Sequence, residues 1–383
     1  MQPTPVIAAG LPVREYVLVA LITAALTFLL TGLVRLFAIR IGAVAYPRQR
    51  DVHVVPIPRL GGLAMYLGVC GGILLAHQLP VLRHAFTSSL DVTGVLVGGG
   101  VIVLIGMLDD RFELDSTTKL AGQTTSAGIL VLFGLQWIVL WVPWGGDGEY
   151  YGTQLYLDQN QGGLLAVLLT VTLVNAMNFI DGLDGLAAGV GLIAAAATCA
   201  FSLNLLDESR GDVTNYPPAL IAATLAGACL GFLPHNFQPA KIFMGDSGSM
   251  LIGLMLAAAT TSASGRVVPN NTGPRDTLAL LSPLLVVAAV LFVPLLDLVL
   301  AVIRRTRRGQ SPFHADKMHL HHRLLEFGHS QRRAVLLIYL WASIIAFGAV
   351  ALRLFDVYIV GWGIGIALLV ALLVSAIPRL RSR

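Results

Sequence analysis

The chain has 383 residues, of which 56% are hydrophobic and only 12% are charged, and its formal net charge is +4. Soluble domains carry about twice this charged fraction, so the composition excludes a soluble globular protein. The three cysteines all fall in apolar stretches without zinc-type spacing, and no basic stretch is interleaved with aromatic residues as in nucleic-acid-binding segments.

Apolar stretches of about 20 residues recur along the whole chain. They predict an all-α polytopic integral membrane protein with about eleven transmembrane helices, forming a single domain over residues 1–383. The predicted spans are residues 16–37, 63–80, 92–108, 119–140, 162–178, 185–205, 218–234, 248–263, 278–302, 334–353 and 357–377.

Lysine and arginine are concentrated in every second loop, which predicts an external N-terminus and a cytoplasmic C-terminus. In this orientation all the unusual polar stretches are cytoplasmic. They define the predicted catalytic loops, approximately residues 41–62, 109–118, 178–184, 235–247 and 304–333. The pI of about 9.1 therefore indicates membrane topology rather than nucleic-acid binding.

The first two cytoplasmic loops each carry candidate binding residues. Arg50 and His53 precede the turn "VPIPRLGG", and Arg59 lies within it; the three could hold a lipid phosphate or simply form a positive-inside loop. The adjacent acids Asp109 and Asp110 end the third span. They are either a solvated helix end or a pair that binds a metal or accepts a proton.

On the next helix, Lys119 and Gln123 are four residues apart and could face the same space as the acids. Ordinary snorkelling of a lysine at the interface is the alternative.

The stretch "NAMNFIDGLDG" places Asn175, Asn178, Asp181 and Asp184 at the end of an apolar run. The glycines that follow predict a helix break near Asp181, which membranes tolerate only where the break lines a wet cavity or packs against protein. Carboxamides suit a nucleoside or a sugar, and carboxylates suit a metal or hydroxyl groups; polar capping between two spans is the alternative.

Two later loops suggest phosphate chemistry. Asp246 lies between glycines before a helix, where it could hold Mg²⁺ beside a phosphate or cap the helix. The stretch "HADKMHLHHRL" gathers histidines with Lys317 and Arg323, a pattern that favours a phosphate clamp over a metal site or a solvated basic loop.

Taken together, "PRLGG", "GMLDD", "NAMNFIDGLDGLAAG", "PAKIFMGDSGSMLIG" and "HADKMHLHHRLLEFG" resemble the polyprenyl-phosphate N-acetylhexosamine-1-phosphate transferases. The resemblance implies transfer of N-acetylglucosamine-1-phosphate from UDP-GlcNAc to a membrane polyprenyl phosphate, with release of UMP. This would be the first membrane step of a cell-envelope glycopolymer pathway in a bacterial inner membrane. It also implies a requirement for Mg²⁺, with Mn²⁺ as an alternative, and leaves a homodimer and a monomer both open.

The resemblance also implies roles for individual residues. Asp109 and Asp110 match the catalytic pair, and Asp246 matches the metal ligand. The implied substrate-binding residues are Lys119, Asn178, Asp181, Asp184, Asn236, His319, His321, His322 and Arg323. Direct transfer and a covalent aspartyl-phosphosugar intermediate both remain open.

Two other functions are possible alternatives. In the sister branch, the phospho-MurNAc-pentapeptide transferases, the histidine run is continuous, whereas Leu320 interrupts it here and favours a simple N-acetylhexosamine. An ion-coupled transporter would use a mid-span acid such as Asp297, but the unusual acids cluster at one membrane face, and no inverted repeat is visible.

Overall fold

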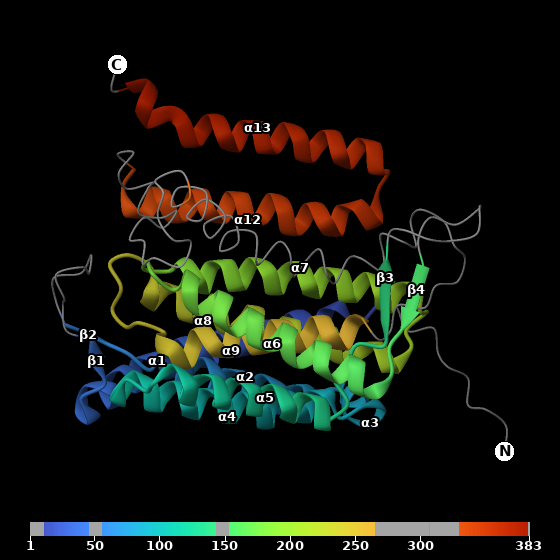
Figure 1. Cartoon of the computed structure of the whole chain (residues 1–383), viewed down its shortest axis with the longest axis horizontal. Coiled ribbons are helices and arrows are strands. Elements are labelled where there is room, and N and C mark those ends of the chain that lie inside the picture. The colour runs from blue at the N-terminus through green and yellow to red at the C-terminus, as the bar shows by residue number, and fades with distance from the viewer. Residues whose placement is uncertain (1–10, 46–55, 143–152, 265–305, 307–328, 382–383) are drawn as a thin grey trace.

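Long helices lying side by side form nearly all of the described part of the molecule (Figure 1). The structure, a computed structural model, describes residues 11–45, 56–142, 153–264, 306 and 329–381. In chain order its helices are α1 (Val13–Ile41), α2 (Gly61–Gln78), η1 (Leu82–His84), α3 (Ala85–Ser88), α4 (Asp91–Phe112), α5 (Ser116–Leu132), α6 (Gln159–Ile180), α7 (Leu186–Glu208), η2 (Val213–Asn215), α8 (Tyr216–Asn236), α9 (Gly245–Ser264), α12 (Gln331–Leu354) and α13 (Val357–Arg381).

The strands within the described ranges form two short antiparallel pairs. Strand β1 (Val44–Ala45) pairs with β2 (Ile57–Pro58), and β3 (Val139–Val142) pairs with β4 (Thr153–Tyr156). The first pair leads from α1 into α2, and the second connects α5 with α6.

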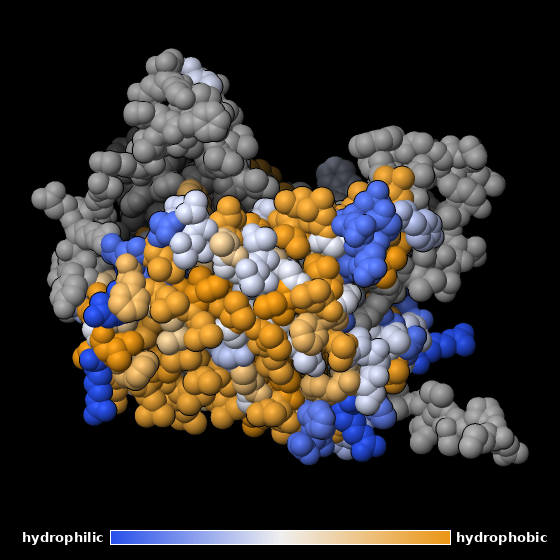
Figure 2. Space-filling view, turned by 60° about the horizontal axis from the view of Figure 1, so that its bottom comes forward, coloured by the Kyte–Doolittle hydropathy of each residue, from blue (hydrophilic) through white to orange (hydrophobic). Residues whose placement is uncertain are grey.

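Within the described ranges, eight helices are long and apolar enough to cross a membrane: α1, α2, α4, α6, α7, α8, α12 and α13. The all-α polytopic class is therefore confirmed. The predicted span 278–302 lies outside the described residues, and each of the other predicted spans overlaps a described helix. Figure 2 shows apolar residues covering the middle of one face, with hydrophilic residues gathered toward its two ends.

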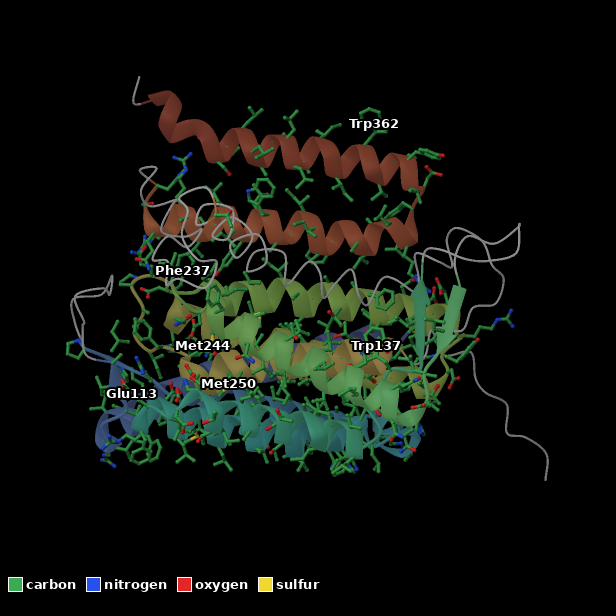
Figure 3. All side chains as sticks on the ribbon, viewed as in Figure 1. Glu113, Trp137, Phe237, Met244, Met250 and Trp362 are labelled. Carbon is green, nitrogen blue, oxygen red and sulfur yellow. The ribbon has the colours of Figure 1, made fainter. Side chains whose placement is uncertain are left out.

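Helix α9 lies at the centre of the bundle, and its residues from Ser247 to Ser264 are all buried. Helices α2, α4, α6, α7 and α8 pack around it, and α1 packs against α2 and α8. Helix α12 lies against α7, and α13 lies outermost on α12. On α13, Trp362 points away from the bundle and is 76% exposed, as expected for a side chain that meets lipid (Figure 3).

One predicted span was too long. The helix expected over residues 119–140 is α5, which ends at Leu132. Gly134 then takes a left-handed φ of +97°, and the chain continues into β3 instead of the helix. Trp137 follows this turn and is buried against the start of α6, where its backbone N–H donates to the carbonyl of Gly162 at 3.3 Å. An apolar stretch that packs on a neighbouring helix resembles a continued span in hydropathy alone.

The bundle has two distinct ends, marked in Figure 3 by Glu113 on one side and Trp137 on the other. The end near Glu113 holds the last residues of α1, α4, α6 and α8 and the first residues of α2, α5, α7 and α9. The described acids and amides that the sequence singled out lie at this end, which contains the candidate active site.

Candidate active site

The chain breaks between α6 and α7 as the sequence predicted. Helix α6 ends at Ile180, and Asp181 is its C-cap residue, with its N–H donating to the carbonyl of Asn178 at 3.3 Å. A short turn follows, and α7 begins after Gly185. The break exposes carboxylates at a helix end without interrupting a helix inside the bilayer, so the backbone groups keep partners.

Two of the predicted site residues fasten this turn to the loop before α9. The backbone N–H of Ala240 donates to Oδ2 of Asp184 at 3.0 Å. The amide of Asn236 accepts from the N–H of Gly185 at 3.0 Å and donates to the carbonyl of Ile242 at 3.1 Å. Asn236 is only 2% exposed. Its described contacts therefore hold two loops together rather than facing an open cavity.

The N-terminus of α9 is wedged between α2 and α4 at glycines. A methyl group on Gly106 of α4 would lie 2.3 Å from Cα of Ser247, and one on Gly62 of α2 would lie 2.2 Å from the backbone N of Gly248. The first N–H groups of α2, from Gly61 and Gly62, donate to carbonyls of the loop before α9 at 3.0 Å. These glycines of "PRLGG" and "GMLDD" therefore allow three helix termini to meet.

Asp110 caps α9 from the neighbouring helix. Its carboxylate accepts from the backbone N–H of Asp246 at 2.9 Å, from the N–H of Ser247 at 3.3 Å and from the hydroxyl of Ser247 at 2.9 Å. A carboxylate at a helix N-terminus gains from both the free N–H groups and the helix dipole. The amide groups that the sequence suggested for phosphate are thus already used by Asp110, which is 6% exposed.

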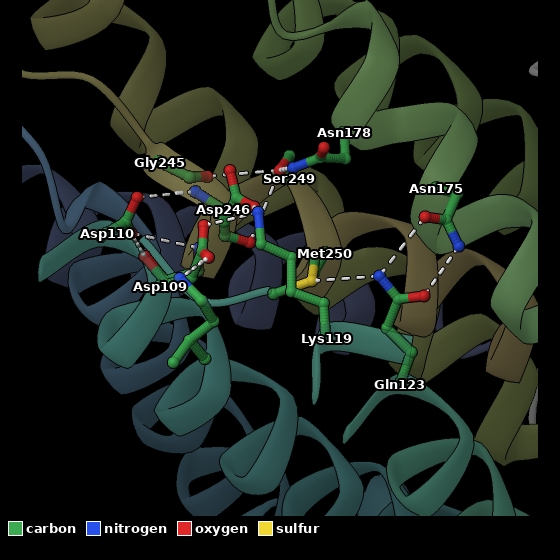
Figure 4. A network of polar contacts seen from close by, with 12 residues as sticks. Asp109, Asp110, Lys119, Gln123, Asn175, Asn178, Gly245, Asp246, Ser249 and Met250 are labelled. Atoms are coloured by element: carbon green, nitrogen blue, oxygen red, sulfur yellow. Dashed lines mark hydrogen bonds and ion pairs between the residues drawn. The ribbon is translucent and has the colours of Figure 1, made fainter. Parts of the chain in front are cut away.

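Asp109, the neighbour of Asp110, points in a different direction. Its Oδ2 lies 2.7 Å from Nζ of Lys119, and the same ammonium group lies 2.9 Å from Oδ2 of Asp246 (Figure 4). Oδ1 of Asp109 accepts from the N–H of Leu114 at 2.8 Å. Lys119 is in the first turns of α5, which Asp115 caps by accepting from two backbone N–H groups. One cation therefore bridges two carboxylates from helices far apart in sequence.

Two amides complete the polar network on the α6 side. The side chain of Asn178 donates to the hydroxyl of Ser249 on α9 at 3.0 Å. Asn175, one turn earlier, turns to α5, where its Nδ2 donates to Oε1 of Gln123 at 2.7 Å. The sequence did not identify Ser247 and Ser249 as site residues. Their position just after Asp246, in the first turn of a helix, was the available signal.

The site has an excess of acids over cations among the described residues. Its carboxylates are those of Asp109, Asp110, Asp181, Asp184 and Asp246; the ammonium of Lys119 contacts two of them, and the charge of Arg59 acts on Asp181. Burial, together with the charges of Asp246, Asp110 and Asp184, raises the pKa of Asp181 to about 8, and Arg59 opposes this rise. Asp181 is therefore protonated at neutral pH, which reduces the repulsion.

The donor chemistry of the site fits a magnesium ion. The described residues contain no preformed group of three or more His, Cys, Asp and Glu side chains with metal-binding geometry. Mg²⁺ does not need one, because it usually takes one or two protein carboxylates and completes its shell with water and phosphate oxygens. Asp246 and Asp181 provide such carboxylates, and the ammonium of Lys119 marks the point where the acids already hold a positive charge.

Several predicted residues lie outside the described ranges. They are Arg50, His53, Asp297, His319, His321, His322 and Arg323. Arg59, the third residue predicted for a lipid phosphate, is described and half-buried, and its charge opposes the rise in the pKa of Asp181.

Comparison with known proteins places the chain among membrane transferases. Residues 92–264 match the family described as Glycosyl transferase family 4. The chain is 59% identical over 373 residues to the decaprenyl-phosphate N-acetylglucosaminephosphotransferase of Mycolicibacterium smegmatis, covering 97% of this chain and 91% of that protein. It is 57% identical over 376 residues to the protein of the same name from Mycobacterium leprae, covering 98% and 93%. It is also 30% identical over 326 residues to the undecaprenyl-phosphate alpha-N-acetylglucosaminyl 1-phosphate transferase of Escherichia coli K12, covering 83% and 80%.

Proposed function

Because the chain belongs to the polyprenyl-phosphate N-acetylhexosamine-1-phosphate transferases, we propose that it transfers N-acetylglucosamine-1-phosphate from UDP-GlcNAc to a membrane polyprenyl phosphate and releases UMP. The names of the relatives support both the sugar and the polyprenyl acceptor. The structural observation that carries the proposal is the bridge from Lys119 to Asp109 and Asp246 at one end of the bundle.

The position of the site suits two substrates from different phases. The donor is water-soluble, the acceptor is a lipid, and the described acids gather where membrane-crossing helices end. Both substrates carry negatively charged phosphates, so their approach requires positive charge. Lys119 and Arg59 supply part of it from the described residues.

Mg²⁺ would supply the rest of the positive charge. Bound Mg²⁺ polarises and neutralises phosphate oxygens. Asp246 would hold it, because its carboxylate already holds the ammonium group of Lys119, and Asp181, whose pKa the charge of Asp246 raises, would contribute a second carboxylate after losing its proton. A lysine that bridges the acids of the free protein could turn to the donor diphosphate when that ligand binds.

Asp109 and Asp110 have different roles in this proposal. Asp109 shares Lys119 and sits at the end of α4, where an acceptor phosphate would present its head group, so it would accept the proton of that phosphate or orient it. Asp110 is buried under the first turn of α9 and would place Asp246 rather than touch a substrate. This refines the expectation that Asp109 and Asp110 form a catalytic pair.

We also propose that the site faces the cytoplasm. At the site end the described chain carries the basic residues Arg35, Arg40, Arg59, Arg111, Lys119, Lys241, Arg332 and Arg333. At the other end it carries Arg14, Arg83, Arg210 and Arg353. This asymmetry supports a cytoplasmic site end.

Labelling tests the orientation. In a variant without the native cysteines, Glu113→Cys should resist an impermeant thiol reagent applied to intact cells, and Asp207→Cys at the opposite end should react. The reverse pattern would overturn the orientation.

A release assay tests the reaction. Purified protein should release UMP from UDP-GlcNAc only when polyprenyl phosphate and Mg²⁺ are both present, and should turn over UDP-MurNAc-pentapeptide slowly. Asp246→Asn should abolish turnover, while Asp207→Asn, which changes an exposed acid at the other end, should match wild type. Turnover without lipid phosphate, or preference for the peptide-bearing donor, would contradict the proposal. Wild-type turnover and an unchanged Mg²⁺ midpoint in Asp246→Asn would contradict the metal assignment.

A further inference from the structure

A second layer of polar contacts lies one helical turn away from the site, inside the bundle. Gln123 follows Lys119 by four residues on α5, Asn175 precedes Asn178 by three on α6, and Met250 follows Asp246 by four on α9. The three side chains meet. Nδ2 of Asn175 donates to Oε1 of Gln123 at 2.7 Å, and Nε2 of Gln123 lies 3.4 Å from Oδ1 of Asn175 and 3.6 Å from Sδ of Met250 (Figure 4).

The amides of this layer are occupied by the protein itself. Gln123 is only 4% exposed, and its amide faces the two neighbouring helices. Asn175 is exposed at one edge, but its two N–H groups are taken by Gln123 and by the carbonyl of Val171 at 2.7 Å. Their contacts therefore bind helix to helix and not to a substrate, and they add no charge to the site.

The hydrogen bonds of this second layer fix the rotation and height of α5, on which the position of Lys119 depends. Lys119 has a long flexible side chain, and its ammonium reaches Asp109 and Asp246 together only if α5 has the correct rotation and height beside α9. Apolar contacts tolerate small slides and rotations, whereas hydrogen bonds between amides depend on direction. The same amides also tie α5 to α6, which carries Asn178 on the next turn.

We propose that Gln123 and Asn175 form a positioning pair for the transfer reaction, holding α5 and α6 so that Lys119 stays between Asp109 and Asp246. The proposal rests on the function proposed above for the kinetic part of its test. It states that the pair contributes to the rate of transfer through the placement of Lys119. A pair that only stabilised the bundle would contribute to folding alone.

Replacing the pair in three ways separates placement from stability. Gln123→Leu leaves Asn175 without its partner and should lower both the melting temperature and kcat. The double variant Gln123→Leu with Asn175→Leu removes both polar groups, so its melting temperature should return toward wild type while kcat stays low. Exchanging the residues, Gln123→Asn with Asn175→Gln, keeps an amide pair and should recover most of kcat.

The expected loss has a characteristic size and pattern. A displacement of about 1 Å at a reacting group costs on the order of 100-fold in rate, so kcat in the double-leucine variant should fall by about 10- to 100-fold. KM for UDP-GlcNAc should change less than kcat, because the two substitutions replace none of the residues proposed to contact the donor and only displace Lys119. Thr124→Leu, which changes an exposed neighbour on α5, is the matched control and should keep wild-type kcat.

A second measurement is independent of the substrate. The rate at which an amine-reactive reagent modifies Lys119, read by peptide mass spectrometry against the exposed Lys241, should rise in both leucine variants and return in the exchanged pair. Wild-type kcat and wild-type Lys119 labelling in the double-leucine variant would overturn the positioning role. An inactive wild-type protein would count against the proposed substrates, and the labelling would still decide the placement of Lys119.

Discussion

The close approach of α4 and α9 at Gly106 can be tested with a single methyl group. In Gly106→Ala the added carbon would lie 2.3 Å from Cα and 2.4 Å from the N of Ser247, whereas ordinary contacts begin near 3.4 Å. Both clashes are with backbone, so the helices must separate by about 1 Å. Overpacking of this kind costs about 1–3 kcal/mol of folding free energy, partly offset by the roughly 0.5–1 kcal/mol that alanine gains over glycine within a helix.

The functional loss should exceed the loss of stability. The methyl group pushes on the residue that Asp110 caps, so Asp246 moves with the start of α9. A displacement of about 1 Å at a reacting group corresponds to about 100-fold in rate.

Turnover of UDP-GlcNAc and thermal unfolding in detergent should be measured together, with Gly128→Ala as control, because a methyl group there meets nothing within 4 Å. Gly106→Ala with turnover within twofold of wild type would refute the reasoning that the α4–α9 contact sets the site.

Three further outcomes follow from the charges of the site. Lys119→Met leaves Asp109 and Asp246 without their shared cation. Because the lysine side chain is 29% exposed, the loss of folding free energy should lie between the losses measured for surface and buried ion pairs, about 1–3 kcal/mol by thermal melting. Turnover should fall by at least about 100-fold. In metal-free protein, the raised pKa of Asp181 contributes stability that is fully present below about pH 4 and is lost as the pH rises toward about 8. The melting temperature of the wild type should therefore fall between these two pH values, and that of Asp181→Asn should fall less. Asp109→Asn should lower turnover by about 10²–10⁴-fold and leave the melting temperature nearly unchanged. Asp110→Asn should lower turnover and the melting temperature together. Equal melting curves for the two variants would contradict the division of roles between Asp109 and Asp110.

Much of the architecture could be predicted from hydropathy. All predicted spans that fall within the described ranges correspond to helices, and the break near Asp181 was located from two glycines and the acids around them. The end of α5 could not be located in this way. Residues 133–140 remain apolar, yet they leave the helix at Gly134 and pack against the start of α6, a decision made by tertiary contacts.

The separate tasks of Asp109 and Asp110 show where sequence reasoning reaches its limit. Adjacent residues on an α-helix point about 100° apart, so the two acids must face different neighbours. Which neighbours they face depends on how α4 rotates against α5 and α9, and that rotation is set by contacts such as the one at Gly106. The sequence could therefore identify the pair but not assign the cap to Asp110 and the shared lysine to Asp109.

The acids of the site also differ in how their charge is compensated, and this difference indicates which of them can change on substrate binding. Asp110 is held by two backbone N–H groups and a hydroxyl of α9, and Asp184 accepts from the backbone of Ala240. These partners are parts of the fold and cannot leave. Asp181 is compensated by a proton, and Asp109 and Asp246 share an ammonium group on a flexible side chain. A proton and a lysine can both move, so we expect Asp109, Asp181 and Asp246 to be the acids that change partners when substrate binds, while Asp110 keeps the start of α9 in place.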